Sequence, residues 1–105
     1  LGTPEDCRRG LAATVQAIQA NTAAEIILLT PNPIAEPGAN AQLAGRVDSI
    51  RGLAGEKQVA LVDVYRLWQE FTTDPAEVAA CLANGLNHPT AAGHRVYALA
   101  LMQLF

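Results

Sequence analysis

One segment of the chain holds most of the side chains that could do chemistry. Residues 84–94, NGLNHPTAAGH, place His88 directly before Pro89. An imidazole changes its charge near neutral pH, so His88 could take a proton from a nucleophile as a general base. Proline disfavours a helical conformation for the residue before it, which holds His88 outside any helix that follows. From the residues alone, His88 is either a catalytic base or a loop histidine bonded to the backbone. We predict that His94 is structural, since it can bond a carbonyl or solvent.

A general base needs a nucleophile, and the sequence offers poor candidates. Ser49 is the only serine, and its surroundings, GRVDSIRG, predict the middle of a helix without a strained turn. Cys81 lies seven residues before His88, but a thiol nucleophile needs a lowered pKa. Asp63, at the end of a predicted strand, is better explained as a helix cap than as a catalytic acid. The residues of this chain therefore leave the nucleophile unassigned.

The two cysteines, Cys7 and Cys81, have neither CxxC spacing nor the partners of a metal site. In an oxidising compartment they could form a disulfide. As two free thiols they would behave as small buried hydrophobic residues. No pattern indicates a metal ion or an organic cofactor, so we expect neither.

The charge and hydropathy of the chain limit the classes of molecule that it could bind. The chain has 105 residues, a net charge of −3 and a pI near 5.2, whereas nucleic acids and anionic membranes attract basic surfaces. The longest apolar run, residues 26–29, has the length of a strand and not of a membrane span. No signal peptide is visible, and a start at Leu1 suggests a chain cut from a longer one. Secretion from a bacterium and a cytoplasmic location both remain open.

The elements that would position His88 begin with a helix. In TPED, Thr3 can cap a helix, Pro4 suits its first position, and Asp6 completes a capping box. Apolar residues then recur at spacings of three and four, which predicts a helix over residues 4–21.

Two short apolar runs predict strands. Residues 25–30, EIILLT, and 59–64, VALVDV, are rich in branched side chains, as in strands of a parallel sheet. Three prolines and a glycine in residues 31–38 predict a segment without regular structure. Apolar residues over 43–53 predict a helix between the strands, with Gly55 as its terminator.

The last third of the chain predicts further helices. Residues 65–71 form an amphipathic stretch in which Trp68 and Phe71 are expected in the core. Residues 72–87 predict a loop with a short helix around PAEVAACLA. Residues 91–105 predict a helix so apolar that it needs cover on more than one side.

This order of elements predicts that residues 1–105 form part of a single α/β domain, with parallel strands joined by a right-handed crossover. Two parallel strands are too few, because the edges of a sheet must be paired or covered. The strand at 25–30 is apolar on both faces, so we expect a neighbour on its free side. That neighbour is either chain missing before Leu1 or a second copy of this chain.

The strands IILLTPNP and VALVDVY, followed by LNHPTAAGHRVYA, resemble the C-terminal half of an SGNH (GDSL-type) serine hydrolase in order and spacing. The resemblance implies a flavodoxin-like three-layer sandwich with a parallel sheet, of which this chain supplies the last two strands and flanking helices. It also implies hydrolysis of a small-molecule ester by a Ser-His-Asp triad. The serine and the oxyanion hole would precede Leu1, and the histidine of the triad corresponds to His88.

The sequence departs from that family at the acid, which usually lies three or four residues before the histidine. Gly85 and Asn84 occupy these positions, and we expect Asn84 in the place of the acid. An amide can orient an imidazole, but in such triads aspartate-to-asparagine exchange lowers turnover about 10⁴-fold. The nearest acids in this loop are Asp74 and Glu77.

Residues around the base are candidates for contact with the substrate. Ligands of open α/β sheets bind at the carboxyl ends of the strands, where Pro31 and Asn32 follow the first strand. Leu86 and Asn87 directly precede His88, and we expect all four residues to line the cleft. Alternatively, Pro31 only stiffens a turn and Asn87 stabilises its own loop.

Two functions therefore stay in view. The chain is part of a carboxylic-ester hydrolase with His88 as its base, or it is a catalytically inactive module that keeps the fold for binding or assembly. The presence of His88 before a proline favours the hydrolase, and Asn84 in the place of an acid favours the inactive module.

Overall fold

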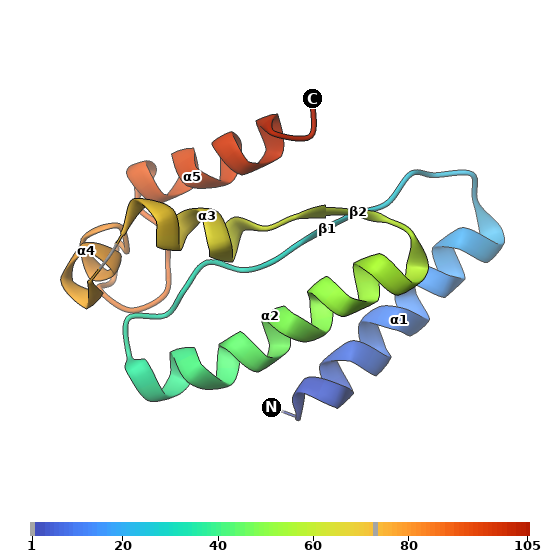
Figure 1. The fold of residues 1–105 in the computed structure, drawn as a ribbon, viewed down its shortest axis with the longest axis horizontal. Helices are drawn as coiled ribbons and strands as arrows, with labels where there is room; N and C mark the ends of the chain where they lie inside the picture. The colour runs from blue at the N-terminus through green and yellow to red at the C-terminus, as the bar shows by residue number, and fades with distance from the viewer. Residues whose placement is uncertain (1, 73) are drawn as a thin grey trace.

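A computed structural model describes residues 2–72 and 74–105 (Figure 1). The elements run in the order α1 (Pro4–Asn21), β1 (Ile27–Leu29), α2 (Pro37–Lys57), β2 (Ala60–Val62), α3 (Val64–Phe71), α4 (Pro75–Ala80) and α5 (Ala91–Met102). β1 and β2 pair in parallel, with Ile27 opposite Ala60 and Leu29 opposite Val62. The predicted α/β class and the parallel pairing are confirmed.

Helices lie on both sides of the two strands. Figure 1 shows α1 and α2 running side by side along one side, with α5 on the other. The core divides in the same way. One cluster joins α1, β1 and α2 through Val15, Leu28, Leu53 and Ala54. The other joins β2, α3 and α5 around Val62, Trp68 and Val96. Because the described residues hold two strands, the full three-layer sandwich stays a prediction.

The helix starts follow their capping residues. The Thr3 side chain accepts a hydrogen bond from the Asp6 N–H, and the Asp6 side chain accepts one from the Thr3 N–H, as the capping box predicts. Asp63 caps α3 by accepting from the Arg66 N–H at 3.1 Å. Thr90 caps α5 by accepting from the Gly93 N–H at 3.1 Å. Satisfying free N–H groups in this way fixes where each helix begins.

Several predicted boundaries are wrong. α2 begins at Pro37, inside the segment expected to be irregular, because Glu36 caps it by accepting from the N–H groups of Gly38 and Ala39. It also continues past Gly55 to Lys57 and ends at Gln58, whose φ of 54° is left-handed.

Other differences concern length and burial. Both strands have three residues rather than six, and α5 ends at Met102 instead of reaching Phe105. Trp68 is fully buried as predicted, but Phe71 is 58% exposed and does not belong to the core.

β1 has an open side. Leu28 points into the cluster with α1 and α2, so strand alternation places Ile27 and Leu29 on the opposite face. These two side chains are 40% and 39% exposed, and β2 is the only strand paired with β1 among the described residues. Within the same residues, no helix has the length and apolar character needed to cross a membrane.

Candidate active site

The loop between α4 and α5 is anchored at both ends, which places His88. Leu82 and Pro89 form an isolated antiparallel bridge. The carbonyl of Cys81 accepts from the Thr90 N–H at 2.9 Å and from the Thr90 hydroxyl at 3.1 Å. His88 therefore lies at the end of a closed loop, three residues before α5 begins at Ala91, and it is exposed to solvent.

Asn84 organises the turn inside this loop. Its Oδ1 accepts from the N–H groups of Leu86 at 3.0 Å, Asn87 at 2.9 Å and His88 at 3.1 Å. Its Nδ2 donates to Oδ1 of Asn87 at 2.8 Å. The amide thus contacts the backbone of His88 rather than its ring, and a role in orienting the imidazole stays a prediction.

The loop is also tied to the segment after β1. The Ala35 N–H donates to the carbonyl of Leu86 at 2.9 Å, and Asn32 Nδ2 donates to the carbonyl of Asn87 at 3.1 Å. The structure therefore brings Asn32 next to Asn87, the residue before His88, although 55 positions separate Asn32 from Asn87 along the chain.

Asn32 is held in turn by α5. The Tyr97 hydroxyl donates to Asn32 Oδ1 at 2.8 Å and accepts from the Asn32 N–H at 3.1 Å. Burial raises the pKa of Tyr97, while the Asn32 N–H acts in the opposite direction, so the hydroxyl stays protonated and able to donate. Asn32 is 8% exposed with its amide bonded inside the protein. Contact of Asn32 or of the half-buried Pro31 with a substrate stays a prediction.

No carboxylate bonds the imidazole of His88 among the described residues. Asp74 caps α4, where its Oδ1 accepts from the N–H groups of Ala76 and Glu77. Three residues before His88, Gly85 has a φ of +66°. An aspartate at that position would be strained, because side chains disfavour left-handed backbone.

Asp63 has a structural role. Its carboxylate accepts from Arg51 at 2.8 Å and from the Thr30 hydroxyl at 3.0 Å, besides capping α3. Burial acts to raise the pKa of Asp63, but the hydrogen bonds, that from Arg51 first, hold this pKa below its ordinary value. The prediction of a capping role is confirmed.

The other candidate nucleophiles are placed away from a strained turn. Ser49 lies within α2, where its hydroxyl donates to the carbonyl of Gly45 at 3.2 Å. Cys7 and Cys81 are both free thiols and half-buried. Among the described residues, no group of three histidine, cysteine or acidic side chains could hold a metal ion.

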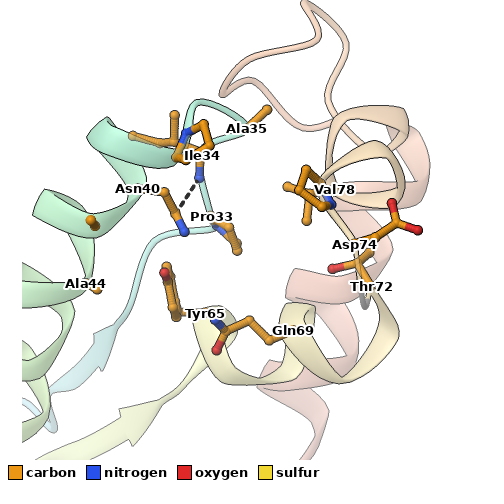
Figure 2. A pocket seen from close by; sticks show the side chains of 13 residues that line it. Pro33, Ile34, Ala35, Asn40, Ala44, Tyr65, Gln69, Thr72, Asp74 and Val78 are labelled. Carbon is orange, nitrogen blue, oxygen red and sulfur yellow. Dashed lines mark hydrogen bonds between the residues drawn. The ribbon is translucent and has the colours of Figure 1, made fainter.

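A cleft with a volume of about 340 Å³ opens next to this site (Figure 2). We call it the Tyr65 cleft. Its walls come from the segment after β1, from the start of α2, and from α3 and α4. The lining residues are Pro33, Ile34, Ala35, Pro37, Asn40, Ala41, Ala44, Tyr65, Gln69, Thr72, Asp74, Pro75 and Val78.

The sequence analysis missed Tyr97, Tyr65 and Asn40. Tyr97 appeared only as one apolar residue of a helix, although its hydroxyl spans the distance to Asn32. Tyr65 carried a usable signal, because it lies directly after the strand end at Asp63, where ligands of open α/β sheets bind. Nothing in the pattern of α2 distinguished Asn40.

Comparisons with known proteins agree with this architecture. Residues 1–96 match the family described as the GDSL-like Lipase/Acylhydrolase family. No curated protein sequence matches the chain.

Solved structures give further matches. A mutant of an acetyl-xylooligosaccharide esterase from Geobacillus stearothermophilus superposes with a TM-score of 0.83 at 22% identity, over 97% of this chain and 47% of that one. An alpha/beta hydrolase enzyme from the metagenome of Lake Arreo, Spain, gives a TM-score of 0.78 at 29% identity, with the same coverage of 97% and 47%. This chain therefore spans about half the length of the solved structures it matches.

Proposed function

Because this chain belongs to the GDSL-like lipase/acylhydrolase family, we propose that it forms part of a carboxylic-ester hydrolase in which His88 is the general base. Family membership and the esterase structures that share the fold support ester hydrolysis in general. The observation that carries the proposal is the anchored loop, which holds an exposed His88 beside the segment that follows the carboxyl end of β1.

The reaction would run in two steps. A serine hydroxyl supplied by polypeptide outside this chain attacks the ester carbonyl while His88 accepts its proton. His88 then returns the proton to the departing alkoxide, which leaves an acyl-enzyme. A water molecule, deprotonated by His88, releases the acid and regenerates the serine. N–H donors outside this chain would stabilise the oxyanion.

Related structures support a serine and a histidine in these roles. Three of the matched structures are catalytic mutants of the acetylxylan esterase from Geobacillus stearothermophilus, in which a histidine, a serine or an aspartate is replaced by alanine. The replaced aspartate and histidine are three positions apart in that chain, and the equivalent spacing here falls on Gly85. At that spacing this chain has a glycine instead of an acid.

The partner that brings the serine would lie against β1. Either the remaining half of the hydrolase domain or a second copy of this chain could occupy the open side of that strand. The remaining half is the better candidate because the only serine of this chain is engaged inside α2.

The test compares the isolated chain with the chain combined with the serine-bearing polypeptide. We expect no hydrolysis of p-nitrophenyl acetate by the isolated chain, and His88-dependent hydrolysis by the combination. Replacing His88 by alanine should lower kcat by about 10³-fold or more, since removing a triad member has effects of this order. Turnover by the isolated chain that is lost in His88→Ala would refute the need for a second polypeptide.

A non-catalytic binding or assembly module is the second candidate. Asn84 in the place of an acid is the observation that favours it. If the combined protein binds an ester without hydrolysing it, and His88→Ala leaves that affinity unchanged, this second candidate replaces the first.

A further inference from the structure

We propose that the Tyr65 cleft binds a neutral, hydroxylated group such as a sugar ring, as the alcohol part of the ester. This assignment to the alcohol part rests on the proposed ester hydrolysis. The binding itself rests on the cleft alone, whose volume of about 340 Å³ falls in the range of small-molecule sites.

A tyrosine hydroxyl without a hydrogen-bond partner among the described residues opens to this cleft. Tyr65 is 5% exposed, and its backbone N–H donates to the Thr30 hydroxyl at 2.9 Å. Its own hydroxyl has no hydrogen-bond partner among the described residues, and Figure 2 shows it directed into the cleft. A tyrosine hydroxyl can both donate and accept a hydrogen bond, so this hydroxyl offers a position for a polar group of a ligand.

A second polar group is fixed beside it. Asn40 Oδ1 accepts from the Ile34 N–H at 2.9 Å, which orients the amide and leaves Nδ2 as a donor. Figure 2 shows this nitrogen on the side of Asn40 that faces Tyr65, with the Gln69 amide across the cleft floor. The Tyr65 hydroxyl, the Asn40 Nδ2 and the Gln69 amide therefore supply both donors and acceptors, which the hydroxyl groups of a ligand can use.

Charge excludes an anionic ligand. The described residues that line the cleft include no lysine, arginine or histidine, and they include one carboxylate, that of Asp74. A carboxylate or phosphate would find no positive partner here, whereas an uncharged group would meet no repulsion. Apolar walls from Pro33, Ile34 and Val78 suit the C–H face of a sugar ring.

The cleft shares a wall with the His88 loop. Ala35 lines the cleft and donates its N–H to the carbonyl of Leu86 at 2.9 Å, two residues before His88. A group bound against Ala35 would therefore lie next to the loop that presents the base. This placement fits the alcohol part of an ester whose carbonyl is at His88.

The test measures binding of methyl β-D-xylopyranoside to the 105-residue chain by amide chemical-shift changes in NMR spectra. We expect saturable shifts at residues that line the cleft. Tyr65→Phe removes only the hydroxyl and should weaken affinity about three- to tenfold, the usual effect of one hydrogen bond. Asn40→Asp keeps the acceptor for the Ile34 N–H but removes the donor, and should weaken binding by a similar factor.

Ser49→Ala is the matched control, because it removes a hydroxyl from the same helix as Asn40 but away from the cleft, and its affinity should equal that of the wild type. Butyrate, an anion, should not shift the cleft residues. The proposal is overturned if the xyloside gives no saturable shifts, if both cleft variants bind as the wild type does, or if butyrate binds in the cleft.

A kinetic comparison separates this proposal from that of the hydrolase. In the combined protein, Tyr65→Phe should raise KM for an acetylated xyloside, and the control Ser49→Ala should leave that KM unchanged, because Ser49 does not line the cleft. Sugar binding that depends on Tyr65, without any hydrolysis, would retain the cleft and reject the hydrolase. Hydrolysis that depends on His88, with no effect of Tyr65→Phe in either assay, would retain the hydrolase and reject the cleft as the sugar site.

Discussion

Asn84 holds the geometry of the His88 loop through a single oxygen atom. Three successive N–H groups, those of Leu86, Asn87 and His88, converge on its Oδ1. An aspartate could accept the same three hydrogen bonds and would bring a negative charge next to the base. Asparagine therefore lacks only the negative charge, which would stabilise an imidazolium at His88 in the proposed hydrolysis.

We predict that Asn84→Asp raises the rate of ester hydrolysis in the combined protein. If position 84 holds the third member of the triad, kcat/KM should rise at least tenfold, within the factor of about 10⁴ that separates aspartate from asparagine in such triads. The measurement is kcat/KM for p-nitrophenyl acetate against pH.

Asn87→Asp is the control, since it places the same charge one residue before His88. It should not reproduce the rise, and a loss of rate would assign Asn87 to contact with the substrate. An unchanged rate in Asn84→Asp, or an equal gain in Asn87→Asp, would remove position 84 from the catalytic machinery.

At the scale of the elements, the packing of α5 against α3 decides where the His88 loop lies. Gly93, in the first turn of α5, is the point of closest approach. A Cβ atom there would lie 2.6 Å from Cη2 of Trp68, 2.8 Å from the carbonyl oxygen of Cys81 and 2.9 Å from Cβ of Pro89. Only glycine therefore allows the helix, the indole and both ends of the loop to meet.

We predict that Gly93→Ala destabilises the chain by about 1–3 kcal/mol, the usual cost of overpacking a close contact. The free energy of unfolding can be measured by urea denaturation followed by circular dichroism. Because Pro89 is one of the contacts, the amide resonance of His88 should also shift.

Gly52→Ala is the matched control in α2, where an added Cβ would meet nothing within 4 Å. Alanine there should stabilise the helix by up to about 1 kcal/mol. If Gly93→Ala were as stable as Gly52→Ala, the close approach of α5 would not be the constraint that fixes the loop.

Local sequence signals predicted the helices and strands, but they did not predict contacts between residues far apart in the chain. Thr3, Asp63 and Thr90 lie where capping chemistry starts a helix, so α1, α3 and α5 could be found from the sequence. The start of α2 was missed because Pro37 was taken as a breaker, although proline also suits the first position of a helix. The pairing of Tyr97 with Asn32 joins residues 65 apart, and no period in the sequence encodes it. The Tyr65 cleft was missed for the same reason, since four separate segments form its walls.

At the scale of the whole molecule, the open side of β1 is continuous with apolar residues of the C-terminus. Ile27 shares a hollow with Leu104 and Phe105 near the start of the strands, and Phe105 is 98% exposed. Further along, Leu29 is 39% exposed on a strand that is paired on one edge among the described residues. Apolar side chains beside an unpaired edge are typical of a surface that another strand covers.

We predict that Leu29→Glu weakens association with the serine-bearing polypeptide but leaves the stability of the isolated chain almost unchanged. Because Leu29 is partly exposed, the free energy of unfolding of the isolated chain should change by no more than about 1 kcal/mol. Association with the serine-bearing polypeptide should weaken at least tenfold, since the new carboxylate would be buried without a partner. Ala13→Glu, on the exposed side of α1, adds the same charge away from β1 and should leave association unchanged.

Analytical ultracentrifugation distinguishes the two polypeptides that could cover β1. A wild-type chain that dimerises by itself, with the dimer lost in Leu29→Glu, would assign this surface to a second copy. A wild-type chain that stays monomeric and binds the serine-bearing polypeptide, with binding lost in Leu29→Glu, assigns it to the remaining half of the domain. Equal association by Leu29→Glu and the wild type would show that the surface beside β1 is not where the serine arrives.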